Sequence, residues 1–288
     1  MIDTLYINGC SWSAGDEIEC DPLFEEYLKN NNLSFMKGNK RKIFSNGNEH
    51  DLIDITEYYN LFNYGSVIVN KLKINNYIND GMGGGSNERI VRKTTQFLFN
   101  YPKDKLKDLL VIIGWTSFDR NEIFLKKYKR WERFNPNHEF INTLEYPSDY
   151  TDLEIKFLNN YHEDYVLKIH SEYERITTLY QQKYLLSNLL DNLNVKYLFF
   201  DVFGFERGFL YKNPINEIKY DDSFFWNDTH KNIISEITMD AFMKTNKYPI
   251  APYLHPMIDG HKNWGEKIYG QLLERNIIDG IKLQKKII

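Results

Sequence analysis

A serine flanked by glycines lies close to the start of the sequence. Ser11 follows the short apolar run 5–7, with Gly9 before it and Gly15 behind it. A strand that ends in a tight turn would expose this hydroxyl at the edge of a sheet, where open α/β sheets bind their ligands. A serine becomes a nucleophile when a neighbouring base takes its proton. The segment therefore indicates acyl chemistry if the chain supplies a base and an oxyanion pocket; a plain turn serine is the alternative.

A glycine-rich turn could supply the oxyanion pocket. Four of the five residues 81–85 are glycine, and Ser86 and Asn87 can cap the helix that follows. Backbone N–H groups without side-chain cover can bind an anion or a developing oxyanion, and a helix N-terminus adds positive potential. The turn has no lysine and matches neither the P-loop nor the dinucleotide fingerprint. A flexible loop is the alternative.

A histidine near the C-terminal end could supply the base. His255 precedes Pro256, which restricts the backbone, and a final helix begins at Asp259 or Gly260. A general base needs such a fixed position and a pKa near neutrality, although a lone loop histidine is commonly solvated. His261 lies inside the helix and is expected to pack or cap.

Further polar residues follow the most apolar strand. The segment 114–122 includes Thr116 at the same predicted sheet edge as Ser11, while Arg120 and Glu122 are expected to form a local ion pair. Basic and aromatic residues alternate in 126–133, a pattern that can bind nucleic acid. The net charge of −4 favours a solvated helix face instead.

Composition excludes several classes. Two cysteines in 288 residues rule out a disulfide scaffold, and no Cys/His spacing indicates a metal site. No cofactor motif is present. The longest apolar run, 109–114, is too short to span a bilayer, and no signal peptide is visible. We therefore expect a cytoplasmic protein.

The order of the expected elements predicts a parallel α/β sheet. Strands are expected at 3–8, 74–78, 109–113 and 195–202, and helices at about 59–73, 86–101 and 259–275. The stretch 148–202 has neither Gly nor Pro and keeps a helical rhythm until its strand. A helix of that length would exceed the width of the domain, so we expect a break near 159–163. The stretches 16–60 and 203–245 read as irregular inserts.

Together these segments resemble the SGNH (GDSL-like) hydrolase superfamily. Members carry their nucleophile in Gly-Asp-Ser-x-(Ser/Thr)-x-Gly, and residues 9–15 have that spacing with Cys10 in place of Asp. The resemblance implies Ser11 as nucleophile and Gly84 as an oxyanion-hole donor. It also implies a three-layer α/β/α, flavodoxin-like fold with a central parallel sheet of about five strands, forming one domain over residues 1–288 with the two inserts.

The chain departs from the family pattern at two motifs. The family's third motif, Gly-x-Asn-Asp, reads Gly-Trp-Thr-Ser here, so Thr116 or Asn87 would have to replace the oxyanion-hole Asn. The last motif, Asp-x-x-His-Pro, ends in His255-Pro256, but Pro252 holds the place of the acid. A distant carboxylate such as Asp228 would then orient the histidine. These signatures resemble a divergent bacteriophage-type branch, which implies a host-cytoplasm location.

Two functions follow from this resemblance. The first is a serine hydrolase, as an esterase, deacylase or acyltransferase, in which Ser11 attacks a small-molecule, glycan-linked or nucleotide-linked ester and His255 acts as base. The second is a catalytically degenerate protein that binds a small ligand or a partner protein, with aromatic residues such as 224–226, Tyr128 and Trp131 forming a stacking pocket. Neither requires a cofactor, metal, membrane or nucleic acid, and the oligomeric state is left open.

Overall fold

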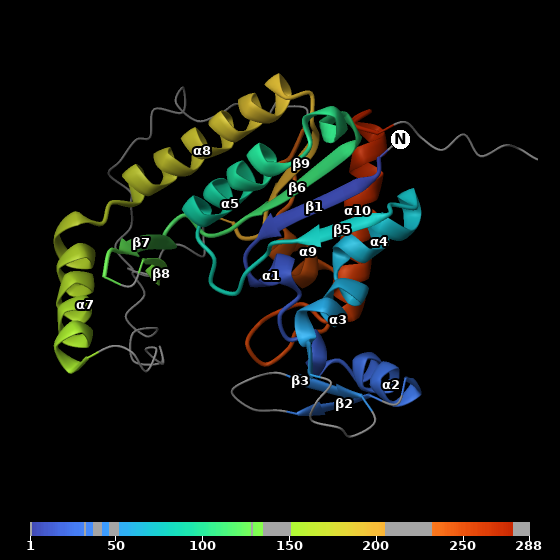
Figure 1. Cartoon of the computed structure of the whole chain (residues 1–288), viewed down its shortest axis with the longest axis horizontal. Coiled ribbons are helices and arrows are strands. Elements are labelled where there is room, and N and C mark those ends of the chain that lie inside the picture. The colour runs from blue at the N-terminus through green and yellow to red at the C-terminus, as the bar shows by residue number, and fades with distance from the viewer. Residues whose placement is uncertain are drawn as a thin grey trace, which may run out of the picture.

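The centre of the fold is a five-stranded parallel sheet (Figure 1). The computed structural model describes residues 2–31, 33–36, 42–45, 52–127, 129–134, 151–204 and 232–278. The strands are β1 (Thr4–Gly9), β5 (Asn76–Asn79), β6 (Leu109–Trp115), β9 (Lys196–Asp201) and β10 (Ile233–Ile234). Their order across the sheet is β10-β9-β6-β1-β5. Numbered by position in the chain this is 2-1-3-4-5 from the β5 edge, the flavodoxin-like order.

Helices cover both faces of the sheet, so the fold has three layers as expected. The helices on one face are α4 (Tyr64–Leu72), α9 (Met239–Thr245) and α10 (Ile258–Glu274), and those on the other are α5 (Asn87–Asn100) and α8 (Glu172–Asn192) (Figure 1). Successive strand residues point to opposite faces. Ile112 accordingly packs toward α4 and α10, whereas Val111 and Ile113 pack toward α5 and α8. Continuous apolar strands are expected when both faces are covered.

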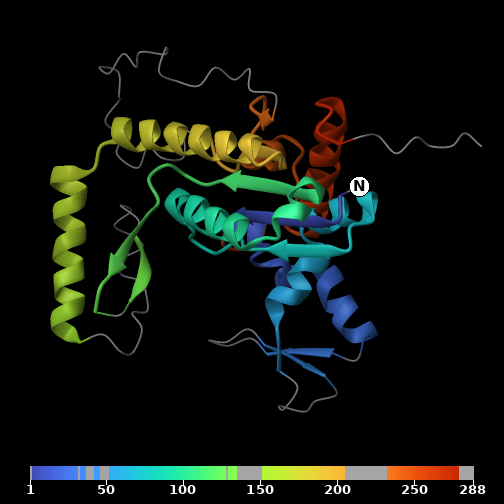
Figure 2. The ribbon, with the colours of Figure 1, turned by 45° about the horizontal axis from the view of Figure 1, so that its top comes forward.

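The N-terminal stretch 16–60, predicted to be an insert, has more regular secondary structure than its weak periodicity indicates. It contains a 3₁₀ turn (Ile18–Cys20), α2 (Pro22–Asn30), strands β2 (Leu33–Met36), β3 (Lys42–Ser45) and β4 (Leu52–Asp54), and most of α3 (Ile55–Phe62). The three strands form an antiparallel sheet beside α2 (Figure 2). The start of α2 has a clear local signal, since Asp21 caps it and Pro22 occupies its first turn.

Two helix boundaries differ from the sequence prediction because side-chain caps interrupt the periodicity. The helix expected at 59–73 is two helices, α3 and α4, divided where Asn63 accepts hydrogen bonds from the backbone N–H groups of Gly65 and Ser66. The break expected at 159–163 lies later. The helix α7 (Asp152–Asp164) continues into a π-helical turn (Tyr165–Ile169), and Ser171 then caps α8.

The second predicted insert, 203–245, includes the fifth strand of the sheet. β10 pairs in parallel with β9, and α9 follows it, so the interpretation of this stretch as wholly irregular was wrong. Residues 205–231, which contain Asp228 and the aromatic cluster 224–226, lie outside the described residues.

The basic segment 126–133 lies on a hairpin, not on a helix face as predicted. Strand β7 (Asn121–Leu125) pairs antiparallel with β8 (Arg130–Phe134), which sets Phe124 opposite Trp131. The hairpin stands beside α7 at the side of the sheet (Figures 1 and 2). In the part of the chain that the structure describes, no helix is both long and apolar enough to cross a membrane.

Candidate functional site

Ser11 lies at the point where the order of the strands reverses. It opens the short helix α1 (Ser11–Ala14) directly after β1, and β1 pairs with β5 on one side and β6 on the other. The crevice outside the carboxyl ends of such strands is the usual ligand site of open α/β sheets. Ser11 is buried, with 5% of its surface exposed. The sequence thus directs this hydroxyl to the predicted sheet edge.

Glycine is required where α1 folds back over the sheet. Gly9 of β1 pairs with Gly114 of β6, and the Ser13 side chain packs over both. A Cβ at Gly9 would lie 2.2 Å from the Ser13 hydroxyl oxygen, and one at Gly114 would lie 2.6 Å from it. The two glycines therefore allow the helix that carries Ser11 to pack directly on the strand ends.

His255 is held by a buried carboxylate that is not in the sequence motif around His255. The His255 Nδ1 lies 2.7 Å from Oε2 of Glu17, whose surface is only 2% exposed. The backbone N–H of Tyr253 donates to both Glu17 oxygens, at 3.1 and 3.0 Å. An ionised carboxylate only accepts hydrogen bonds. Nδ1 therefore carries the proton, which leaves Nε2 as the basic nitrogen.

Glu17 occupies a backbone conformation that is rare for residues other than glycine. Its φ is 67°, in the left-handed region, two residues after Gly15 with φ 87°. Such conformations cost about 1–3 kcal/mol and persist when the surrounding structure fixes them. Here the turn after α1 brings the Glu17 carboxylate beneath the loop that carries His255.

A second acidic residue, Asp21, bonds the end of the loop that carries His255 to the start of α2. One oxygen of Asp21 accepts from the backbone N–H of Leu23 at the start of α2, and the other accepts from that of Ile258 at the start of α10. Both distances are 2.9 Å. The loop between α9 and α10 is thus bonded to residues 17 and 21, a few positions after Ser11.

Ser11 and His255 are connected through the segment 11–17 and not through a direct bond. Among the described residues no hydrogen bond joins the Ser11 hydroxyl to His255. The backbone N–H of Asp16, next to Glu17, donates to the Ser11 carbonyl at 3.0 Å. Catalytic hydrogen bonds in structures without substrate are often long and shorten on binding. The geometry therefore brings acid, base and serine into one region.

The glycine-rich turn packs on the same helix. The Met82 N–H donates to the Gly9 carbonyl at 3.1 Å, and a Cβ at Gly81 would lie 2.6 Å from the Ala14 nitrogen. Gly84 has φ 67°. Within the described residues its N–H makes no hydrogen bond, so the oxyanion role that the resemblance implies for Gly84 stays a prediction.

The Asn87 side chain positions a loop. Its Nδ2 donates to the carbonyls of Thr116 at 3.3 Å and Ser117 at 3.2 Å, while its Oδ1 accepts from the Thr116 N–H at 3.0 Å. The amide would have to give up a contact to donate to an oxyanion, and that role stays a prediction. The Oγ1 of the buried Thr116 accepts a hydrogen bond from Arg120 Nη1 at 3.0 Å, so this contact leaves the hydroxyl proton available for donation.

A buried polar network fixes the strand ends beneath the turn. The fully buried Asn8 accepts from the Gly9 N–H at 2.8 Å and from Arg89 Nη1 at 3.3 Å. Arg89 also donates to the Asp80 carbonyl at 2.8 Å, just before the glycine turn. Burial lowers the pKa of Arg89, and the nearby Asp80 carboxylate opposes that change. The network holds the turn against β1.

The predicted ion pair between Arg120 and Glu122 is not formed. Glu122 instead accepts two hydrogen bonds from Arg92 of α5, at 2.9 and 2.8 Å. Arg120 lies before β7, whereas Glu122 lies within that strand and is bonded by Arg92 of α5. Arg120 turns to Thr116 instead.

His261 packs in the interior, as predicted. It is fully buried, stacks on Tyr64 with ring centroids 6.2 Å apart, and has a pKa lowered to about 3, first by burial and then by the charge of His255. The neutral ring is therefore the native form.

The free energy of unfolding should fall as the pH drops below about 6.5. Protons then bind His261 in the unfolded chain, where its pKa is near 6.5, but not in the folded chain until about pH 3. This group contributes a slope of about 1.4 kcal/mol per pH unit in that window. Urea unfolding from pH 7 to pH 4 of wild type and His261→Leu should give a steeper decline for wild type. Parallel curves would contradict the assignment.

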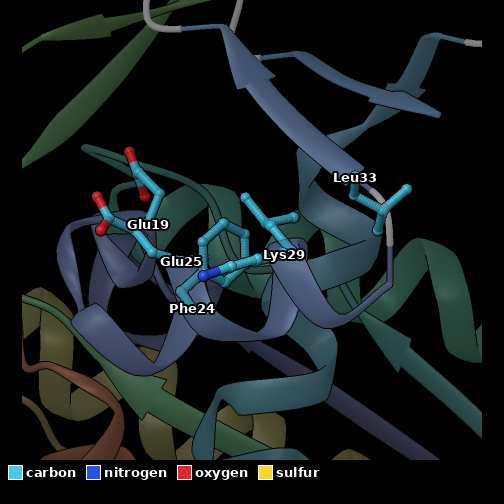
Figure 3. Close-up of a pocket in the computed structure, with 6 residues that line it drawn as sticks. Glu19, Phe24, Glu25, Lys29 and Leu33 are labelled. Atoms are coloured by element: carbon cyan, nitrogen blue, oxygen red, sulfur yellow. The ribbon is translucent and has the colours of Figure 1, made fainter. Parts of the chain in front are cut away.

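A separate cavity lies beneath α2 and holds neither Ser11 nor His255 (Figure 3). Its volume is about 360 Å³, and Glu19 and Glu25 lie together at one end with Leu33 at the other. The Tyr59 hydroxyl donates to Glu19 at 2.6 Å. The described ranges contain no group of His, Cys, Asp and Glu residues arranged to hold a metal ion.

One protein family matches most of the chain. Its sequence profile covers residues 45–282 and is described only as a family of unknown function, DUF6071. The match includes the glycine turn, Thr116 and His255, and starts after Ser11 and Glu17. No curated protein matches the sequence. Because the profile spans well over half of the sequence, the chain belongs to the DUF6071 family.

Proposed function

We propose that the protein is a serine-dependent acyl hydrolase or acyltransferase. Ser11 is the nucleophile, His255 the general base and Glu17 the acid that orients the base. The observation that carries the proposal is the 2.7 Å contact between Nδ1 of His255 and the buried carboxylate of Glu17, which lies six residues after the glycine-flanked serine. That contact fixes the tautomer and stabilises the imidazolium that forms during acyl transfer.

The residues have complementary roles in the reaction. Ser11 Oγ attacks the ester carbonyl while its proton passes to Nε2 of His255. The N–H groups of Ser11 and Gly84, with the Thr116 hydroxyl, would donate to the resulting oxyanion. His255 then gives its proton to the departing alcohol, and an acyl group remains on Ser11. Water or a second alcohol, activated by the same histidine, releases this acyl group.

The resemblance to SGNH hydrolases supports the proposal. The largest departure from the family pattern is the missing acid near His255, and Glu17 can take that role. Pro252 stands where the family pattern has an acid, and Asp228 is not needed for that role, because Glu17 reaches the histidine from the nucleophile's own segment. The substrate class is a small-molecule or glycan-linked ester.

A non-catalytic, ligand-binding function is the second candidate. Two observations favour it: the Asn87 amide is fully engaged with the backbone at Thr116 and Ser117, and no hydrogen bond joins Ser11 to His255 among the described residues. Such a protein would keep the crevice without the reaction.

A fluorophosphonate probe should label wild-type protein at Ser11, because the base activates that hydroxyl. Ser11→Ala should abolish labelling, as measured by intact-mass spectrometry. Ser187→Ala is the matched control, since Ser187 lies on α8 and donates to the Tyr184 carbonyl. An unlabelled wild type that still binds small ligands would support the second candidate.

A further inference from the structure

Arg120 presents a cationic group at the sheet edge that carries Ser11. It follows β6, and its Cζ lies 5.5 Å from the ring centroid of Phe203. Phe203 in turn contacts Trp12 edge-on, with centroids 5.2 Å apart. Trp12 is the residue after Ser11 in α1. The Phe203 ring therefore links Arg120 to the helix that carries Ser11.

The guanidinium is held in place without a carboxylate. Its Nη1 donates to Thr116 Oγ1 at 3.0 Å, and the Phe203 ring supports its face. Among the described residues no carboxylate lies within ion-pair distance of it. By contrast Arg92 pairs with Glu122 and Arg175 with Glu88. Most of the five donors of Arg120 thus have no partner in the part of the chain that the structure describes.

The acidic residues nearest to Arg120 in sequence are Asp119 and Glu122. Glu122 is engaged by Arg92. Asp119 is buried, and among the described residues no ion pair joins its carboxylate to Arg120. The charge on Arg120 is therefore not neutralised by the residues next to it in sequence.

A helix terminus adds positive potential to the same loop. The 14-residue helix α5 begins at Asn87, and the Asn87 side chain bonds the backbone of Thr116 and Ser117. The positive end of this helix thus abuts the loop that carries Arg120. A guanidinium fork matches the oxygen pairs of carboxylates and phosphates.

We propose that Arg120 binds an anionic group, a carboxylate or phosphate, on the ester that Ser11 attacks. That the ligand is an ester rests on the proposed function, but binding of the anion can be measured without any reaction. It makes Arg120 a specificity-determining residue and the substrate an anionic ester.

Binding to a Ser11→Ala protein tests the proposal. Three matched acetate esters serve as probes: 4-acetoxybenzoate, 4-acetoxyphenyl phosphate and the neutral methyl 4-acetoxybenzoate. Calorimetry should show that at least one anionic ester binds about ten- to a hundredfold more tightly than the neutral one. The better of the two anions identifies the natural group. Adding Arg120→Gln should remove this preference, while adding Lys105→Gln, an exposed lysine before β6, should not.

The possible results separate this inference from the proposed function. Equal affinity for all three esters, or a preference that survives Arg120→Gln in a protein with a wild-type circular dichroism spectrum, overturns the role of Arg120. Arg120-dependent anion binding in a protein that never labels at Ser11 supports the anion site and contradicts the hydrolase.

Discussion

Glu17→Gln should lower kcat/KM of the proposed esterase by about 10⁴, as loss of the orienting acid does in serine triads. The glutamine has one acceptor and one donor where the carboxylate has two acceptors. If its NH₂ group faces His255, Nδ1 becomes the bare nitrogen and Nε2 carries the proton, so the base cannot accept from Ser11. If its oxygen faces His255, the NH₂ group opposes the Tyr253 N–H, which now donates to Glu17. Hydrolysis of 4-nitrophenyl acetate measures the loss.

Glu19→Gln is the matched control for this variant. It removes the same charge two residues further along, where the carboxylate accepts from Tyr59 at 2.6 Å and does not contact His255. Its kcat/KM should stay within about twofold of wild type, as for substitutions outside the reacting groups. Should Glu17→Gln keep activity within tenfold, while its unfolding curve matches wild type, another group must orient His255.

Trp264→Ala should lower the free energy of unfolding by about 3–5 kcal/mol. The indole is fully buried and joins α10 to the sheet and to α9: its ring lies 5.3 Å from Phe200 and 5.2 Å from Phe242. Removing it leaves a cavity at the centre of that layer, which the surrounding helices can fill only partly. Urea unfolding measures the loss.

Trp131→Ala provides the comparison for the same side-chain deletion. Trp131 is 45% exposed on the hairpin, where Arg92 lies 4.7 Å over its ring. Its removal should cost about 1 kcal/mol or less. Trp264→Phe, which retains a ring, should fall between the two alanine variants. Similar losses for Trp264→Ala and Trp131→Ala would show that α10 does not depend on this core contact.

The sequence predicts the sheet well because the burial of its central strand is visible locally. The run 109–113 is continuously apolar, and all five of its residues are buried in β6. Ser86 likewise caps α5 as expected, by accepting from the Arg89 N–H. The two-residue strand β10 has no comparable signal, since Ile233 and Ile234 do not suffice to establish a period. Its position follows from pairing with β9, which is a tertiary contact.

The candidate site likewise has residues with a local sequence signal and residues without one. Ser11 and His255 stand out because their glycine and proline neighbours restrict the backbone, which is local information. Glu17, the partner of His255, has no such local signal, because it is 238 residues away in sequence and is one of 40 acidic residues. The contacts of Asn87 are not visible in the sequence for a related reason: its side chain bonds a loop 29 residues later.

The short turn after β1 places nucleophile and acid six positions apart, whereas the base comes from a loop 238 residues beyond the acid. During synthesis, a growing chain therefore holds Ser11 and Glu17 for most of its elongation without the imidazole that would activate the hydroxyl in the proposed mechanism. In the proposed mechanism Ser11 would become reactive only once His255 has reached Glu17, in the loop that the Asp21 contact at Ile258 ties to the N-terminal segment. The rate at which Ser11 becomes reactive after dilution from denaturant would thus report how fast the loop with His255 docks on Glu17.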